Sequence, residues 1–137
     1  MKGFPLAEFL LRKDVGSMKK ELIAAKLTLT DNEATELWQV YEQYSAELSE
    51  VNDRKTAILK KYSQEYDTLT DDQAHDLIRR WLETDIDQAK LRQHFAEGFR
   101  KVLPGKKVAT FLQLEGRISM MMDVQLSSEL PLARSHQ

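Results

Sequence analysis

The fold is decided by the stretch Leu69-Thr70-Asp71-Asp72-Gln73-Ala74, which repeats the pattern of Leu29-Thr30-Asp31-Asn32-Glu33-Ala34 at a spacing of 40 residues. In each copy the threonine hydroxyl can accept a hydrogen bond from the backbone N–H three residues later. The side chain of Glu33 or Gln73 can in turn accept one from the N–H of that threonine, which completes the reciprocal capping box of an α-helix. The repeat therefore predicts two helix starts, at Asp31 and at Asp71.

Few helix-breaking residues occur around these two starts. The chain has 137 residues, and no glycine or proline occurs between Gly16 and Gly98. This run is longer than an ordinary globular helix, so we expect two helices that meet at the second capping box. We therefore predict one all-α domain over residues 1–137, with helices at about 6–26, 31–67, 71–103 and 106–130 and a tail at 131–137.

Apolar residues recur at helical spacing in these segments and predict their buried faces. In the first segment they are Leu11, Val15, Met18, Leu22 and Ala25. In the second they are Ala34, Leu37, Tyr41, Tyr44, Leu48, Val51, Ile58 and Tyr62, with Lys55 as the one charged interruption. In the third they are Ala74, Ile78, Trp81, Leu82, Ile86, Ala89, Phe95, Phe99 and Val102. In the fourth they are Val108, Phe111, Leu112, Ile118, Met122 and Leu126.

The lengths of the two central helices predict the shape of the molecule. At about 1.5 Å per residue each helix would be roughly 50 Å long, whereas a compact domain of this size has a radius of gyration of about 14 Å. The short turn at 68–70 makes the two helices antiparallel. We therefore expect an elongated antiparallel long-helix hairpin with flanking N- and C-terminal helices. Because such a hairpin cannot cover its own apolar stripes, we also expect a homodimer.

The register of this hairpin follows from its tip. Equal rise on both helices pairs positions whose numbers add up to about 139, so Lys55 should face Asp85 and Asn52 should face Gln88. Our hypothesis is that these polar interruptions form one layer that fixes the register, as buried polar residues do in coiled coils. The alternative is that they are solvated residues at a splayed edge.

Composition and motifs exclude several classes of function. The formal net charge is −2, so the chain lacks the bulk basicity that drives binding to nucleic acid. It has no cysteine, which excludes disulfide scaffolds and thiolate zinc sites. No glycine-rich phosphate loop occurs, and Ser45, Ser49 and Ser63 have no histidine within a helical turn, so we expect no catalytic residues and no enzyme. Charged residues interrupt every apolar stretch, so we expect no membrane span.

The histidines offer little for a metal site. His94 and His136 have no suitable partners at local spacing. A weak site is conceivable at the start of the third helix, where His75 lies near Asp71, Asp72 and Asp76. The alternative is an ordinary solvated, acidic helix start, and we accordingly expect no metal and no cofactor.

Basic residues gather around the break between the last two helices. Arg100 and Lys101 suit a helix C-terminus, but Lys106 and Lys107 fall on the next helix N-terminus, where the helix dipole disfavours cations. They could form a basic corner that contacts acidic clients or an acidic partner, or they could pair locally with carboxylates of the first or fourth helix. The full set of candidate client-binding basic residues is Arg79, Arg80, Arg92, Arg100, Lys101, Lys106 and Lys107. A similar choice, between a binding surface and core filling, applies to Met120, Met121 and Met122.

The capping motifs also resemble a family signature. Leu69-Thr70-Asp71-Asp72-Gln73 fits the Leu-Thr-x-x-Gln motif of the Spy/CpxP family of periplasmic helical proteins, and the motif from Leu29 to Glu33 is similar, with glutamate in place of glutamine. Leu48-Ser49-Glu50-Val51-Asn52-Asp53-Arg54 and the run from Phe99 through Pro104 to Glu115 resemble an uncharacterised, exported subgroup from Gram-negative bacteria. The likeness extends from about residue 11 to about residue 132.

This resemblance implies a function that the residues alone do not. Members of the family form cradle-shaped dimers and act as ATP-independent chaperones or envelope-stress accessory proteins, so we expect a periplasmic protein that binds unfolded or envelope protein clients. The opening Met1-Lys2-Gly3-Phe4-Pro5-Leu6 is too short for an export signal, so either the protein is cytosolic or the chain begins after a removed signal. The resemblance implies the second, and we expect a periplasmic protein whose signal has been removed. The alternative is an envelope sensory or regulatory module that binds a specific protein partner or a metal, although the histidines and cysteines of metal-sensing relatives are missing.

Overall fold

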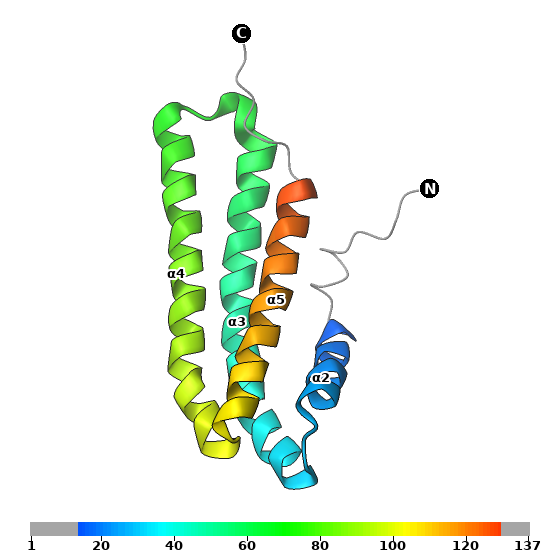
Figure 1. Cartoon of the computed structure of the whole chain (residues 1–137). Coiled ribbons are helices and arrows are strands. Elements are labelled where there is room, and N and C mark those ends of the chain that lie inside the picture. The colour runs from blue at the N-terminus through cyan, green and yellow to red at the C-terminus, as the bar shows by residue number, and fades with distance from the viewer. Residues whose placement is uncertain (1–13, 130–137) are drawn as a thin grey trace, which may run out of the picture. The chain divides into compact units, whose positions relative to one another are not determined.

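A computed structural model describes residues 14–129 of the chain. Its helices are α2 (Asp14–Leu27), α3 (Asp31–Glu65), α4 (Asp71–Val102) and α5 (Gly105–Glu129), and the short 3₁₀ helix η1 (Tyr66–Thr68) joins α3 to α4 (Figure 1). No strand occurs in this range. The predicted all-α class is therefore confirmed. The predicted helical residues 6–13 and the tail at 131–137, together with His136, lie outside the described residues.

Both capping boxes form as predicted. At the start of α3 the Glu33 N–H donates to Thr30 Oγ1 over 3.1 Å, and the Thr30 N–H donates to Glu33 Oε1 over 3.0 Å. At the start of α4 the Gln73 N–H donates to Thr70 Oγ1 over 3.1 Å, and the Thr70 N–H donates to Gln73 Oε1 over 3.0 Å. These bonds satisfy backbone donors that the first turn of a helix leaves unpaired, which explains why the two boundaries agree with the sequence.

The other helix boundaries differ from prediction by one or two residues. α3 ends at Glu65 rather than 67, because the chain tightens into η1 and the Leu69 N–H reaches both the Glu65 and the Tyr66 carbonyls. α2 continues to Leu27, where Thr28 ends it in the left-handed region with φ of 51°. A residue in that conformation is a common helix end, although it is usually glycine. α5 begins at Gly105, directly after Pro104.

The described residues divide into two compact units. One unit, which we call the hairpin unit, comprises residues 39–98, namely most of α3, η1 and most of α4. The other, which we call the terminal unit, comprises residues 14–38 and 99–129, with α2, α5, the start of α3 and the end of α4. The assignment of the whole chain to a single domain stays a prediction.

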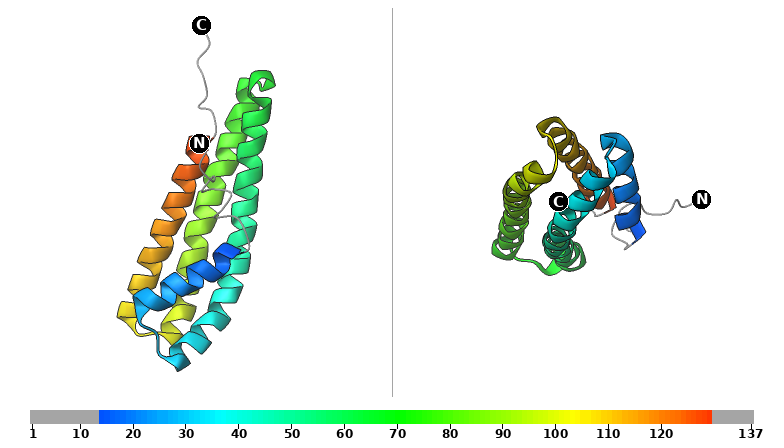
Figure 2. Two further views of the ribbon diagram at one scale, coloured as in Figure 1. Left: turned by 90° about the vertical axis from the view of Figure 1, so that its right-hand side faces the viewer. Right: turned by 90° about the horizontal axis from the view of Figure 1, so that it is seen from below.

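In the hairpin unit the two helices run antiparallel and side by side (Figures 1 and 2). The α3 side of its core follows the predicted stripe, with Tyr41, Tyr44, Leu48, Val51 and Ile58 all buried. The ring of Tyr44 meets Phe95 of α4 edge to face, with centroids 5.6 Å apart. An ideal Cβ at Gly98 would lie 3.4 Å from Val40 Cγ1, so glycine permits a close approach of the helices at this end.

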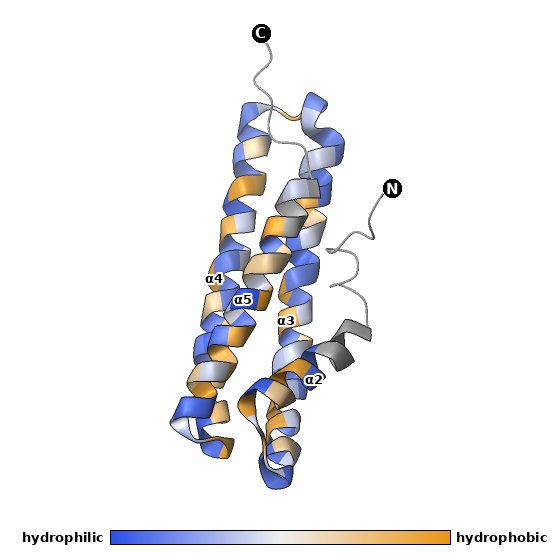
Figure 3. Cartoon of the chain, turned by 45° about the vertical axis from the view of Figure 1, so that its right-hand side comes forward, coloured by the Kyte–Doolittle hydropathy of each residue, from blue (hydrophilic) through white to orange (hydrophobic). Residues whose placement is uncertain are grey.

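The predicted buried face of α4 was wrong over its first half. Ile78, Leu82 and Ile86 are exposed, and Ala89 is exposed as well. The residues buried instead are Leu77, Thr84 and Gln88, whereas Phe95 and Phe99 of the predicted stripe are buried as expected. The true seam lies on a different face of the helix from Ile78, Leu82 and Ile86. Two of its members are polar, so the apolar pattern does not indicate it. α4 therefore carries polar residues inside and apolar residues outside, and Figure 3 shows apolar and polar residues alternating along it.

The terminal unit has a small core of its own. α2 packs against α5, and the rings of Phe99 and Phe111 lie 4.4 Å apart. The buried apolar residues of this unit are Ile23, Leu27, Leu37, Phe99, Leu103, Val108 and Phe111. The predicted buried face of α2 was wrong at two positions, because Leu22 and Ala25 are exposed, whereas Ile23 and Leu27 are buried.

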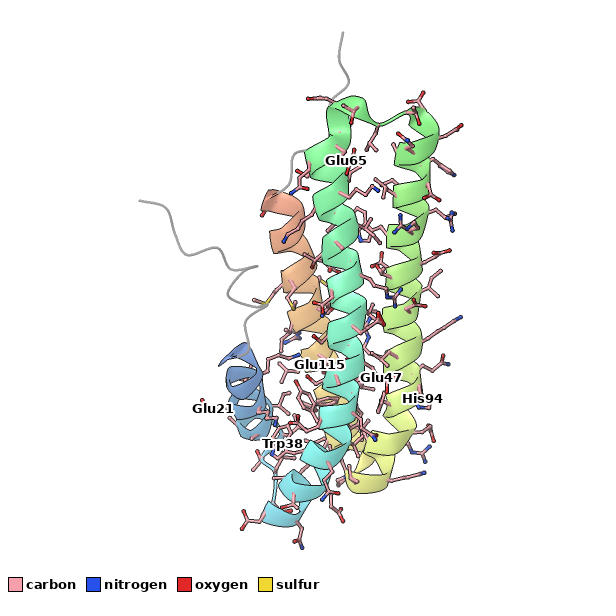
Figure 4. All side chains as sticks on the ribbon, turned by 180° about the vertical axis from the view of Figure 1, so that it is seen from behind. Glu21, Trp38, Glu47, Glu65, His94 and Glu115 are labelled. Carbon is pink, nitrogen blue, oxygen red and sulfur yellow. The ribbon has the colours of Figure 1, made fainter. Side chains whose placement is uncertain are left out.

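One charged pair is buried within the terminal unit. Glu115 of α5 is only 2% exposed, and its Oε1 lies 3.2 Å from Nζ of Lys19 on α2 (Figure 4). A buried carboxylate is tolerated when it has a close cationic partner, so this pair ties α2 to α5.

No helix within residues 14–129 is long and apolar enough to cross a membrane.

Candidate functional site

The seven basic candidates are divided between the two units. Arg79, Arg80 and Arg92 lie on α4 in the hairpin unit. Arg100 and Lys101 at the end of α4, and Lys106 and Lys107 at the start of α5, belong to the terminal unit. The candidates thus fall into two groups, one in each unit, and each group is described by itself.

In the terminal unit the basic corner is partly neutralised. Lys107 Nζ donates to Glu33 Oε1 over 2.6 Å and to the Thr28 carbonyl over 3.0 Å. The hydrogen bond from Lys107, with that from the Thr30 N–H, lowers the pKa of Glu33 below its ordinary value. Lys107 therefore pairs with a carboxylate of its own chain, but this carboxylate lies on α3 and not on the first or fourth predicted helix. Arg100, Lys101 and Lys106 have exposed side chains.

In the hairpin unit Arg80 lines a cavity between α3 and α4. The cavity has a volume of about 260 Å³. Its lining consists of Arg54, Ala57, Ile58 and Lys61 from α3 with Leu77, Arg80 and Glu83 from α4. Ile58 and Leu77 are buried, whereas the three basic side chains are exposed. We call this cavity the basic groove, because it combines an apolar floor with a cationic rim.

The ion pairs of the rim leave the basic groove with excess positive charge. Its single carboxylate, Glu83, already lies 2.8 Å from Arg79 outside the groove. Arg80 has its nearest carboxylate contact at 3.9 Å, to Asp76, and Lys61 makes no ion pair with any described residue. Two of the three cations are therefore weakly neutralised and accessible to an anionic group.

Arg54 is the third cation of the rim and is more firmly held. Its Nε lies 2.7 Å from Glu50 and its Nη2 lies 3.0 Å from Asp87. The hydrogen bonds to Glu50 and then Asp87 raise the pKa of the Arg54 guanidinium above its ordinary value. Arg54 thus joins α3 to α4 and fixes one end of the basic groove.

Two further cavities of the hairpin unit are more acidic. One, of about 340 Å³, shares Lys61, Leu77 and Arg80 with the basic groove and continues toward the tip. It adds Glu65, Leu69, Asp72, Gln73 and Asp76 to the lining. The other, of about 500 Å³, is lined by Ala46, Glu47, Glu50, Val51, Asp87, Lys90, Leu91 and His94. Glu47 of α3 and His94 of α4 mark its place in Figure 4.

A polar layer crosses the middle of the hairpin unit. Lys55 Nζ lies 2.8 Å from Asp85 Oδ1, and Gln88 Nε2 donates to Asn52 Oδ1 over 2.8 Å. The pairing predicted from the hairpin register is thus confirmed for both pairs. Lys55 is only 2% exposed, so the alternative of a solvated edge is wrong for this residue. The role of the layer in fixing the register stays a hypothesis.

Sequence reasoning missed two residues of the basic groove, Arg54 and Lys61. The signal that could have found them is the hairpin register, which places Lys61 opposite the segment around Leu77 and Ile78. Because both residues occupy solvent-facing positions of a long helix, composition alone gives no reason to distinguish them from other surface cations.

In the part of the chain that the structure describes, no group of three or more His, Asp or Glu side chains could hold a metal ion. The conceivable site at His75 is therefore not assembled. Asp76, one of its proposed ligands, instead accepts a 2.6 Å hydrogen bond from Arg79, which lowers its pKa below the ordinary value.

Comparisons with models of protein families, with curated proteins and with solved structures found no match to this chain.

Proposed function

We propose that this protein is a periplasmic client-binding protein, an ATP-independent chaperone or envelope-stress accessory protein of the Spy/CpxP type. The observation that carries the proposal is the basic groove, in which Lys61 and Arg80 flank a floor formed by Ile58 and Leu77. An unfolded chain offers acidic and apolar side chains together, which is the chemistry that such a groove matches. The resemblance of the capping motifs to the family supports the same function.

Two physical effects contribute to this mechanism, one to the encounter with the client and the other to holding it. Long-range attraction from the rim cations increases the rate of encounter with anionic clients, and salt screens it. Apolar contact with the small floor then holds the client weakly, because burial contributes only about 25 cal/mol per Å² of apolar surface. Weak holding permits release without a nucleotide. In this proposal the protein acts as a homodimer, which gives each client two grooves.

Suppression of client aggregation tests the proposal. At equimolar ratio and low salt, the protein should slow the aggregation of a denatured client protein, as measured by light scattering. Lys61→Glu should abolish most of this protection, because it neutralises the rim of the basic groove. Lys60→Glu is the matched control, since Lys60 is an exposed neighbour on α3 outside the lining and undergoes the same charge change. Equal protection by the two variants, or none by the native protein, would contradict the proposal.

Calorimetric titration with zinc and copper separates this function from the sensory alternative. The client-binding proposal expects no saturable heat at micromolar metal. Tight stoichiometric binding would favour the envelope sensory module instead.

A further inference from the structure

The first half of α4 carries an apolar stripe that its own hairpin does not cover. Ile78, Leu82 and Ile86 are 39%, 55% and 53% exposed. They follow one another at intervals of four residues, so they lie in a row on one face of the helix. The seam through Leu77 and Thr84, not this row, is buried in the hairpin unit. Single exposed apolar residues are ordinary, but a continuous row marks an interaction surface.

We propose that this row, which we call the α4 stripe, is the face on which a second copy of the chain packs, antiparallel and with a two-fold axis at Leu82. This inference rests on the homodimer of the proposed function and names the surface that forms it. In an isologous contact each residue meets its symmetry equivalent. Leu82 therefore meets Leu82 of the second copy, and Ile78 of each copy meets Ile86 of the other.

Charge decides between an antiparallel and a parallel arrangement. Asp71 and Asp72 lie three helical turns before Leu82, and Arg92 lies three turns after it. Among the described residues none of these three charged side chains forms an ion pair. Antiparallel packing brings the acidic pair of one copy to Arg92 of the other, whereas parallel packing sets like charges opposite each other.

Two charged residues beside the α4 stripe are already paired within their own chain. Arg79 is paired with Asp76 and Glu83, and Asp85 is paired with Lys55. At seven residues on either side of Leu82, the antiparallel arrangement sets His75 against Ala89, so a small side chain receives a larger one. Covering the stripe therefore leaves neither Arg79 nor Asp85 as an unpaired charge at the interface.

Single-cysteine cross-linking tests both the face and its direction, because the natural chain has no cysteine. Residues on the two-fold axis come within the Cα separation of about 4.4–6.8 Å that a disulfide needs. After mild oxidation, Leu82→Cys should give a covalent dimer of most of the protein. Val124→Cys on α5, also an exposed apolar position, should stay uncross-linked and serves as the control.

The direction is tested with two more variants. Ile78→Cys and Ile86→Cys should each cross-link poorly alone, but an equimolar mixture of the two should give a covalent heterodimer. Efficient self-cross-linking of each variant alone would indicate parallel packing and would overturn the proposed arrangement. Preferential cross-linking of Val124→Cys would place the interface on α5 and would also overturn it.

Solution mass separates failure of the face from failure of the homodimer. Light scattering should give twice the chain mass of 15.9 kDa for the native protein at tens of micromolar. Leu82→Glu should reduce the mass to that of one chain with unchanged helical circular dichroism, because Leu82 is exposed in the single chain. A Leu82→Glu protein that remains dimeric would overturn the α4 stripe but leave the homodimer. A monomeric native protein would overturn both, while client protection would still report on the basic groove.

Discussion

At the scale of single residues, Glu33 has two roles, and the sequence indicates only the first of them. It completes the capping box with Thr30, and the same Oε1 also receives the ammonium of Lys107. Gln73 occupies the equivalent position in the second capping box and accepts the same backbone hydrogen bond without a charge. The chain therefore contains its own comparison between a cap that is charged and a cap that is neutral.

Glu33→Gln should keep the start of α3 but remove its dependence on acid pH. Because the pKa of Glu33 is lowered in the folded state, its charge stabilises the fold above the ordinary glutamate pKa near 4.5, and this stabilisation is lost as pH falls through the lower folded value. The variant should be less stable than the native protein at pH 7, and the difference should be smaller at pH 3. Thermal unfolding followed by circular dichroism at the two pH values measures this, and a difference that is as large at pH 3 as at pH 7 would contradict the assignment. Gln73→Ala, which removes a neutral cap, is the control that should lower stability equally at both pH values.

At the scale of elements, the contact of α3 with α4 depends on polar residues at its middle. Gln88 is buried and donates to Asn52 from the opposite helix. Lys55, one turn further along α3, is buried beside Asp85. Such a layer adds less stability than apolar packing would, but it is satisfied in one register only, because a shift would strand a buried amide or ammonium group.

Asn52→Ala should destabilise the hairpin unit by about 1–3 kcal/mol, because it leaves the buried Gln88 amide without its acceptor. The double variant Asn52→Leu/Gln88→Leu should recover most of that loss, since an apolar pair has no group to satisfy. Urea unfolding of the two variants and the native protein measures both differences. If the double variant is as unstable as the single one, the stability of this layer comes from packing and not from the hydrogen bond.

At the scale of the whole molecule, the proposed homodimer links stability to concentration. A dimer that unfolds to single chains gains stability by mass action, so its thermal midpoint rises with protein concentration. For two chains of this length the rise is about 2–3 °C per tenfold concentration. Leu82→Glu should remove the dependence, and differential scanning calorimetry at two concentrations measures it. A midpoint of the native protein that stays constant would argue against assembly.

Features set by residues close in sequence could be predicted. The starts of α3 and α4, the turn between them and the break at Pro104 all follow from local chemistry. The pairs Lys55 with Asp85 and Asn52 with Gln88 followed from the position of the turn, because both helices rise equally from it.

Features that depend on which helical face is covered could not be predicted. On α4 the apolar row through Leu82 competes with a seam that contains Thr84 and Gln88, and apolar content favours the wrong one. Only some residues of the basic groove could be predicted from the sequence, for a related reason. Arg80 was a candidate, but Lys61 differs from Lys60 only in lining a cavity, which is a property of the packed hairpin and not of either residue.

The two capping boxes also bear on how the chain reaches its fold. Each box closes within four residues, and the helices that it begins make their main-chain bonds locally, so little loop closure precedes helix formation. Chains of this kind fold on the microsecond to millisecond scale, far faster than proteins built from distant strand pairings. A new copy would therefore spend little time as an unfolded chain, and under the proposed function it would seldom bind to another copy as a client.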